Sequence, residues 1–224
     1  MRYLITHSLL SSWLYSMKEN PYADAETEDT SREDFLKTLR REPTETTEAM
    51  QNGIDFENLV TDILNGKIKT ERVQSMTVEP NTGEVMEEGT ALPKWYEAAS
   101  KVAEIVKGSQ LQYVATKRCT IGGMDFLLYG RLDALKHGCI YDIKFSKSYD
   151  RGKYFDSTQH PMYFALVPEA ANFTYVVSNG TEVWTELYWW DEARRIEPII
   201  EDFMRWLEEQ GLMEIYKEKW VAKE

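Results

Sequence analysis

The chain has 224 residues, a formal net charge of -12 and a sequence pI of about 4.9. This length suits one domain that buries its own core and needs no disulfide or structural metal to fold. The two cysteines, Cys119 and Cys139, lack CxxC spacing, which argues against a zinc or iron–sulfur site and favours a reducing compartment. The N-terminus lacks the apolar run of a secretory signal, and no segment has the length of a membrane span. We therefore expect a cytoplasmic protein without membrane contact.

The acidic charge weighs against nucleic-acid binding, because a phosphate-binding surface is normally basic. Acidic residues are concentrated, however, in 19–48, in 79–88 and in the C-terminal third, whereas residues 131–153 are rich in lysine and arginine. The basic residues of that segment are Arg131, Lys136, Lys144, Lys147, Arg151 and Lys153. Divalent cations also neutralise clustered carboxylates, so net charge alone does not exclude a DNA substrate.

The first half of the chain predicts helices joined by polar loops. Helices are expected at 6–18, at about 32–41, at 52–64 and at 92–108, from apolar residues at helical spacing. Residues 20–32 are polar and acidic without periodicity, and 78–89 contain Pro80-Asn81-Thr82-Gly83, so both segments are predicted to be loops.

From residue 111 the pattern changes to strands. These are expected at about 111–121, 124–135, 139–145, 173–178 and 182–189. A helical stretch near 158–166 interrupts them, and residues 191–219 return to helix. The order predicts an α/β (mixed α+β) fold, a single domain over 1–224 with one central sheet flanked by helices. In this domain an N-terminal helical region covers about 1–108, and C-terminal helices cover about 191–224.

Two carboxylates and a lysine lie on consecutive predicted strands. Asp133 belongs to 124–135, and Asp142 and Lys144 belong to 139–145, with Lys136-His137-Gly138 as turn material between them. Because side chains alternate along a strand, Asp142 and Lys144 share one face. The pattern therefore predicts a polar site on a hairpin.

This site has the donor types that a hard divalent cation prefers. Magnesium takes oxygen ligands and keeps several waters, so Asp133, Asp142 and the Ile143 carbonyl suffice as protein ligands, with Glu57 on the 52–64 helix completing the set. Such an ion lowers the pKa of a bound water and offsets charge on a scissile phosphate. Lys144 would orient that water or stabilise the transition state.

Four separated motifs, and in addition an opening helix, resemble those of a known nuclease family. Gly53-Ile54-Asp55-Phe56-Glu57 resembles a helical motif in which a metal-binding His or Glu follows a glycine by four residues. Gly130-Arg131-Leu132-Asp133 is similar to a GxxD strand motif, and Asp142-Ile143-Lys144 to a (D/E)xK motif. Gln159-His160-Pro161-Met162-Tyr163 is similar to a QxxxY helix, and Ser11-Ser12-Trp13-Leu14-Tyr15 to an opening helix. Through them the chain resembles the PD-(D/E)xK nucleases, in particular the RecB-like exonuclease branch.

The resemblance implies a restriction-endonuclease-like fold and a DNA exonuclease that uses Mg or Mn in phage or bacterial recombination or repair. It also implies DNA as partner, and either a ring-like homo-oligomer or a recombination partner protein. The implied catalytic residues are Glu57, Asp133, Asp142 and Lys144, and the implied metal ligands are Glu57, Asp133, Asp142 and Ile143. The expected substrate-binding residues are Gln159, Tyr163, Lys147 and Arg151. The cysteines of a cluster-bearing relative and a Walker A loop are lacking.

Each motif taken alone also has a plain structural interpretation. Asp142 and Lys144 would then be a solvent-facing strand pair, Glu57 an exposed acid, and Tyr163 a packed ring beside Gln159. His160 is interpreted as structural, and the aromatic residues Trp184, Tyr188, Trp189 and Trp190 as core rather than as a base-stacking surface. Two further alternatives are a non-catalytic member of the fold that binds nucleic acid or protein, and an acidic DNA-mimic inhibitor.

Overall fold

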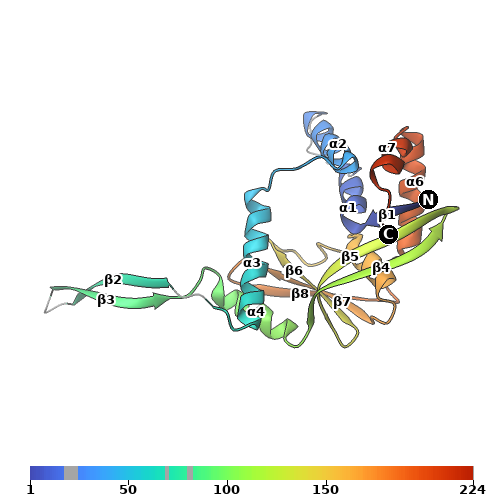
Figure 1. The fold of residues 1–224 in the computed structure, drawn as a ribbon. Helices are drawn as coiled ribbons and strands as arrows, with labels where there is room; N and C mark the ends of the chain where they lie inside the picture. The colour runs from blue at the N-terminus through green and yellow to red at the C-terminus, as the bar shows by residue number, and fades with distance from the viewer. Residues whose placement is uncertain (18–24, 69–70, 80–82, 224) are drawn as a thin grey trace.

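The computed structural model describes residues 1–17, 25–68, 71–79 and 83–223 (Figure 1). Its helices are α1 His7–Ser16, α2 Ala25–Arg40, α3 Glu48–Leu64, α4 Tyr96–Val106, α5 Gln159–Leu166, α6 Ile196–Glu209 and α7 Met213–Lys219. Its strands are β1 Arg2–Thr6, β2 Glu71–Glu79, β3 Gly83–Ala91, β4 Gln110–Ile121, β5 Met124–Lys136, β6 Cys139–Phe145, β7 Asn172–Ser178 and β8 Val183–Trp189.

Six of these strands form one mixed sheet around β5. One edge of β5 pairs antiparallel with β4, and its other edge is shared by β1 and β6. Parallel β1 pairs with residues 125–129, whereas antiparallel β6 pairs only with 134–136 and then continues along β7. Strand β8 closes the sheet beside β7. Residues 130–133 are thus left between two neighbours on the same edge, and we call this gap the fork.

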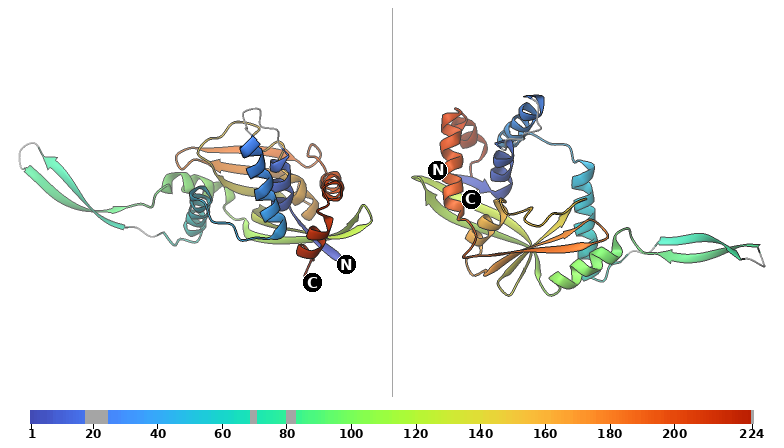
Figure 2. Two further views of the ribbon diagram at one scale, coloured as in Figure 1. Left: turned by 90° about the horizontal axis from the view of Figure 1, so that it is seen from above. Right: turned by 180° about the vertical axis from the view of Figure 1, so that it is seen from behind.

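Helices cover the sheet and enclose two hydrophobic clusters. Figures 1 and 2 show α1, α2, α6 and α7 above the sheet and α4 below it, with α3 alongside. The first cluster includes Trp13, Phe173 and Phe203, and packs α1 and α6 against the sheet. The second includes Phe56, Val102 and Val176 and joins α3 and α4 to the sheet. The expected fold class, a central mixed sheet flanked by helices, is confirmed.

The predicted strands from residue 111 to 189 are present, with ends that differ by one residue at most. The turn between β5 and β6 has positive φ at His137 (49°) and Gly138 (74°), the conformation of a type I′ hairpin turn. Helix α5 matches the helical stretch predicted near 158–166 to within one residue. The predicted C-terminal helix is divided into α6 and α7 around Gly211, whose φ is 68°.

The N-terminal predictions need correction. Residues 78–89 are not a loop, because β2 and β3 pair as an antiparallel hairpin from Glu71↔Ala91 to Glu79↔Gly83, while 80–82 lie outside the described residues. The predicted loop 20–32 is helical from Ala25 onward, and α3 begins at Glu48 rather than at 52 because Thr47 caps it. Strand β1 is absent from the sequence-based expectations; at five residues it shows too short a pattern and is specified by pairing with β5.

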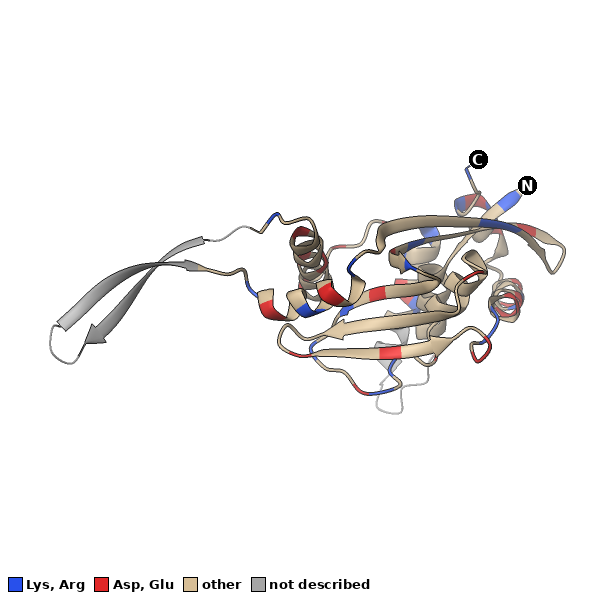
Figure 3. Cartoon of the chain, turned by 90° about the horizontal axis from the view of Figure 1, so that it is seen from below, with Lys and Arg blue, Asp and Glu red and all other residues tan. Residues whose placement is uncertain are grey.

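Two tryptophans that were expected in the core lie on the surface. Trp189 and Trp190 are 45% and 56% exposed, so the core interpretation is wrong for them, whereas Trp184 and Tyr188 pack against the first cluster. Seen from below, the strands carry few charged residues, and acidic positions are spread over helices and loops (Figure 3). Within the described part of the chain, no helix is both long and apolar enough to cross a bilayer.

Candidate active site

The fork in the sheet brings the predicted site residues together. Between Tyr129, where β1 pairing ends, and Ala134, where β6 pairing begins, this edge of β5 pairs with none of the described strands. Side chains from α5 and β5 itself occupy this gap: the Tyr163 hydroxyl donates to the Arg131 carbonyl at 2.9 Å. A backbone acceptor that a neighbouring strand would normally satisfy is therefore satisfied by a side chain of α5.

Gly130 allows α5 to approach the fork. A Cβ at this position would lie 2.7 Å from Leu166 Cδ1 and 2.7 Å from Tyr163 Cε1, closer than van der Waals contact permits. The glycine of the GxxD motif thus has a packing reason, because it lets Tyr163 reach the β5 backbone. Its presence indicates close helix–strand contact rather than flexibility.

Asp133 links β5 to β6 where their pairing ends. Its Oδ2 accepts a hydrogen bond from the Ile143 backbone N–H at 2.8 Å. The alternation of side chains between the two faces of β5 also changes here. Leu132 and Leu135 both contact the first cluster, although they are three residues apart, whereas Ala134 belongs to the second. Burial, then the nearby Asp142 and Glu57 carboxylates, raises the pKa of Asp133 well above its usual range, against the Ile143 hydrogen bond.

Asp142 is the most buried carboxylate of the group, 2% exposed. Its Oδ2 lies 2.7 Å from Lys144 Nζ, as expected for side chains two apart on one strand face, and its Oδ1 accepts a hydrogen bond from the Gln159 amide. Ile143, between them, turns toward the second cluster instead. The predicted Asp142, Lys144 and Gln159 are therefore in direct contact.

Lys144 lies in a strongly acidic environment. Burial lowers its pKa, but the Asp142 and Asp133 carboxylates outweigh that effect and raise the pKa above the usual lysine value. Its charge, after burial, helps to lower the pKa of His7 to about 3, so that imidazole is neutral near pH 7. The His7 ring meets Tyr163 edge to face with centroids 5.5 Å apart. The site thus contains one fixed ammonium beside one neutral imidazole.

Glu57 reaches the site from α3. The Gln112 amide donates a hydrogen bond to Glu57 Oε1, and the Glu57 charge contributes to the raised pKa of Asp133. Gln112 has a left-handed φ of 51° and interrupts the β4–β5 pairing opposite Asp133, although Leu111↔Ala134 and Tyr113↔Leu132 keep one register. Non-glycine residues in this conformation are uncommon and concentrate at functional sites.

Two predicted substrate-binding residues lie outside this contact network. Lys147 and Arg151 are exposed on the segment 146–158, which connects β6 to α5, and their side chains form no hydrogen bond or ion pair with other described residues. The neighbouring Lys153 is used internally, since its Nζ donates to Ser146 Oγ and to the Ser148 carbonyl. Two cations beside the site therefore remain available.

The donor types suit a hard divalent cation. Asp142 Oδ2 is buried without a hydrogen bond among the described residues, although Lys144 Nζ lies beside it. Burial, with the charges of Asp142 and Glu57, raises the pKa of Asp133, so three carboxylates act on one another here. As the side chains stand, however, no group of three or more His, Cys, Asp or Glu residues in the described ranges is arranged to hold a metal. Cation binding would require Lys144 and Gln159 to release part of the Asp142 carboxylate.

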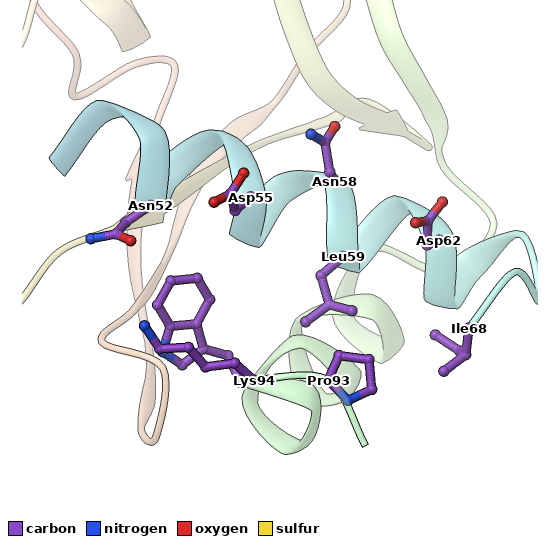
Figure 4. Close-up of a pocket in the computed structure, with 9 residues that line it drawn as sticks. Asn52, Asp55, Asn58, Leu59, Asp62, Ile68, Pro93 and Lys94 are labelled. Atoms are coloured by element: carbon purple, nitrogen blue, oxygen red, sulfur yellow. The ribbon is translucent and has the colours of Figure 1, made fainter. Parts of the chain in front are cut away.

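A separate hollow of about 390 Å³ lies between α3 and the segment before α4 (Figure 4). Asn52, Asp55, Asn58 and Asp62 of α3 line it, whereas Glu57 does not. Its other residues are Leu59, Ile68, Pro93, Lys94 and Trp95. The hollow is distinct from the fork and contains none of the predicted catalytic residues.

Sequence reasoning misses three residues of this region. None of His7, Gln112 and Glu186 belongs to a sequence motif that marks a functional residue. His7 follows the Thr6 cap that begins α1, where Thr6 Oγ1 accepts from Leu9 N–H. Gln112 bonds Glu57, 55 residues away, and Glu186 bonds Tyr149, 37 residues away, so no local signal marks these contacts. His160 is structural as predicted: its ring stacks on Tyr188 with centroids 4.2 Å apart.

Comparison with known proteins establishes the fold. The sequence matches no family model and no curated protein. The structure is similar to the crystal structure of SSO0001, with a TM-score of 0.50 and 13% identity, covering 92% of this chain and 77% of that chain. It is also similar to "Putative exonuclease" from Eubacterium rectale, with a TM-score of 0.51 and 10% identity, covering 97% and 83%. The chain therefore shares a mixed α+β fold, over nearly its whole length, with a protein that bears an exonuclease name.

Proposed function

We propose that the protein is a DNA nuclease of the PD-(D/E)xK type, dependent on Mg or Mn, and that it acts as an exonuclease. The observation that carries the proposal is the buried contact of Asp142 with Lys144 and Gln159 beside Asp133. Burying several charged groups together costs folding energy, and strongly shifted pKa values concentrate at functional sites. The exonuclease name of one structural neighbour supports the same activity.

Each side chain then has a distinct task. Glu57, Asp133 and Asp142, with the Ile143 carbonyl, would hold the metal, which supplies an activated water and offsets charge on the phosphate. Lys144 keeps its proton at neutral pH, because the carboxylates raise its pKa, and it would stabilise the negative charge that builds on the scissile phosphate. Gln159 and Tyr163 hold Asp142 and the β5 backbone in position. Lys147 and Arg151 would bind flanking phosphates.

The test is cleavage of labelled DNA with Mg or Mn, using linear and circular substrates in single- and double-stranded form. Asp142→Asn, Lys144→Met and Glu57→Gln should each slow cleavage by about 100-fold or more, since each removes a group that acts on the reacting atoms. An exonuclease degrades linear DNA and spares the closed circle. A role in phage or bacterial recombination or repair, alone or with a partner protein, stays a prediction from the resemblance.

Matched controls come from the same elements. Asp125 on β5 and Lys136 beside the β5–β6 turn carry the same charges away from the fork, so Asp125→Asn and Lys136→Met should leave cleavage unchanged. If the wild type cuts no DNA with either metal, or if the three site variants cut like the wild type, the proposal is wrong. In the first case a metal titration by calorimetry separates a metal-free binding protein from an inactive enzyme.

A further inference from the structure

The segment 146–158, which we call the β6–α5 loop, connects strand β6, which carries Lys144, to helix α5, which begins at Gln159. Its three aromatic side chains differ in how far they are packed against the rest of the protein. Tyr149 lies against Trp184 with ring centroids 5.4 Å apart, and Tyr154 stacks on Tyr175 at 4.3 Å. Phe155, by contrast, is 67% exposed. Of the loop's three aromatic rings, Phe155 is therefore the one that is exposed to solvent.

A buried carboxylate holds this loop in place. Glu186 on β8 is 8% exposed and accepts hydrogen bonds from Tyr149 Oη at 2.7 Å, from Gly152 N–H at 3.2 Å and from Tyr154 N–H at 3.2 Å. The Tyr188 hydroxyl is a further donor. These donors are neutral, so the carboxylate is stabilised by hydrogen bonds from the loop rather than by an ion pair. The loop is therefore ordered before any ligand binds.

The loop also carries the free cations described above. Lys147 and Arg151 are exposed, the first before the anchored segment 149–154 and the second within it, while Asp156 is paired with Arg194 at 3.6 Å. Asp150 is the remaining exposed acid on the loop. An exposed aromatic ring on the same loop as free lysine and arginine side chains is a combination by which proteins bind single strands: the ring stacks on a base, and the cations contact the phosphates. Duplex bases are already stacked and do not offer a free face.

We infer that the β6–α5 loop is a binding site for single-stranded DNA, in which Phe155 stacks on an unpaired base while Lys147 and Arg151 bind the adjoining phosphates. The inference deepens the proposed function and rests on it, because it assigns the strand that enters the site. Because Glu186 holds the loop backbone at Gly152 and Tyr154, the loop loses less backbone entropy when it binds a ligand. The loop connects β6, which carries Lys144, to α5, which begins at Gln159.

The experiment measures binding without cleavage. Fluorescence anisotropy with a short labelled single-stranded oligonucleotide in EDTA gives Kd for the wild type, Phe155→Ala, Phe155→Leu and Phe155→Trp. We expect Phe155→Ala and Phe155→Leu to weaken binding by about tenfold, and Phe155→Trp to bind like the wild type, because the aromatic face and not apolarity alone is required. Tyr15→Ala, which removes an equally exposed ring (67%) on α1, should leave Kd unchanged. Arg151→Gln should lower the salt dependence of binding.

Three results would overturn the inference: no binding of the single strand by the wild type, unchanged Kd in Phe155→Ala, or equal loss for blunt duplex and single strand. The proposed function is judged separately by cleavage. Normal cleavage with unaffected binding in Phe155→Ala rejects the loop site alone, whereas single-strand binding that depends on Phe155 without any cleavage rejects the enzyme and keeps the loop site.

Discussion

The Asp133 carboxylate accepts the backbone N–H of Ile143, with 2.8 Å between Oδ2 and the nitrogen. The ladder bonds between β5 and β6 end at Ala134 and Tyr141, so this side chain continues the connection one position further. Burial and the neighbouring carboxylates raise the pKa of Asp133, while the same hydrogen bond opposes them. Asp133 therefore links β5 to β6 and is also a proposed metal ligand.

Replacing this carboxylate should separate its two roles. Asp133→Asn keeps an oxygen for the Ile143 N–H and removes the repulsion from neighbouring acids, so we expect stability to be unchanged or higher by up to about 1 kcal/mol. Cleavage should fall by at least about 100-fold. Asp133→Leu should lose about 1–3 kcal/mol, because the N–H is left buried without an acceptor. Urea unfolding and DNA cleavage rates measure both effects. Equal unfolding free energies for the two variants would contradict this account of the hydrogen bond.

The left-handed backbone at Gln112 predicts a difference between two small replacements. Gln112→Gly should be about 1 kcal/mol more stable than Gln112→Ala, because alanine retains the Cβ that makes this conformation costly. Both variants lose the hydrogen bond to Glu57 and should cleave DNA about tenfold more slowly. Denaturant unfolding and steady-state kinetics check the two statements. Wild-type cleavage in both would mean that Gln112 does not position Glu57.

Two glycines in the nuclease-like motifs should respond in opposite ways to alanine. Gly130→Ala places a methyl group against Tyr163 and Leu166 and should destabilise the fold by about 1–3 kcal/mol. Gly53 lies within α3, and the Cβ of an alanine there would meet no atom within 4 Å, so Gly53→Ala should stabilise by about 0.5–1 kcal/mol through helix propensity. Thermal unfolding of the pair is the measurement, and a shift of the same sign in both would argue against the close packing at the fork.

His160 should make stability depend on pH. Burial, with Arg194 nearby, lowers its pKa to about 4, so the folded state keeps the imidazole neutral while the unfolded chain takes up a proton near pH 6.5. Its contribution is complete above about pH 6.5 and is lost progressively as the pH falls toward 4, at a total of a few kcal/mol.

Comparison with His160→Phe isolates this contribution, because His7 titrates in the same direction and is unchanged in the variant. The variant keeps a ring beside Tyr188 and should lose less stability between pH 7.5 and pH 5 than the wild type in urea unfolding. Parallel pH dependence in the two proteins would show that His160 is not responsible.

Glu186 should control the order of the β6–α5 loop. Glu186→Gln replaces one acceptor oxygen by a donor facing donors that already point inward, and we expect a loss of about 1–3 kcal/mol with faster proteolysis within 146–158. Glu182→Gln, an exposed acid next to β8, serves as the control. Mass spectrometry of limited digests locates the cuts. Cleavage by protease elsewhere, with the loop intact, would reject the anchoring role.

The sequence by itself determined the elements whose signal is local. Alternating apolar residues predicted β4 to β8, helical spacing predicted α1, α3, α4 and α5, and the order of the motifs placed Asp133, Asp142, Lys144 and Gln159 on particular elements. Side-chain period and turn chemistry act over a few residues, so they are legible without any knowledge of the fold.

Only the tertiary structure decided how those elements meet. Strand β1 exists because β5 offers an edge, and the β2–β3 hairpin spans a segment whose proline and glycine suggested a loop. The fork arises because β1 and β6 share one edge of β5 without filling it, which places Tyr163 against the Arg131 carbonyl. The Gln112 partner of Glu57 and the loop partners of Glu186 lie dozens of residues away in the chain. Contacts between distant residues depend on chain topology, which no local pattern encodes.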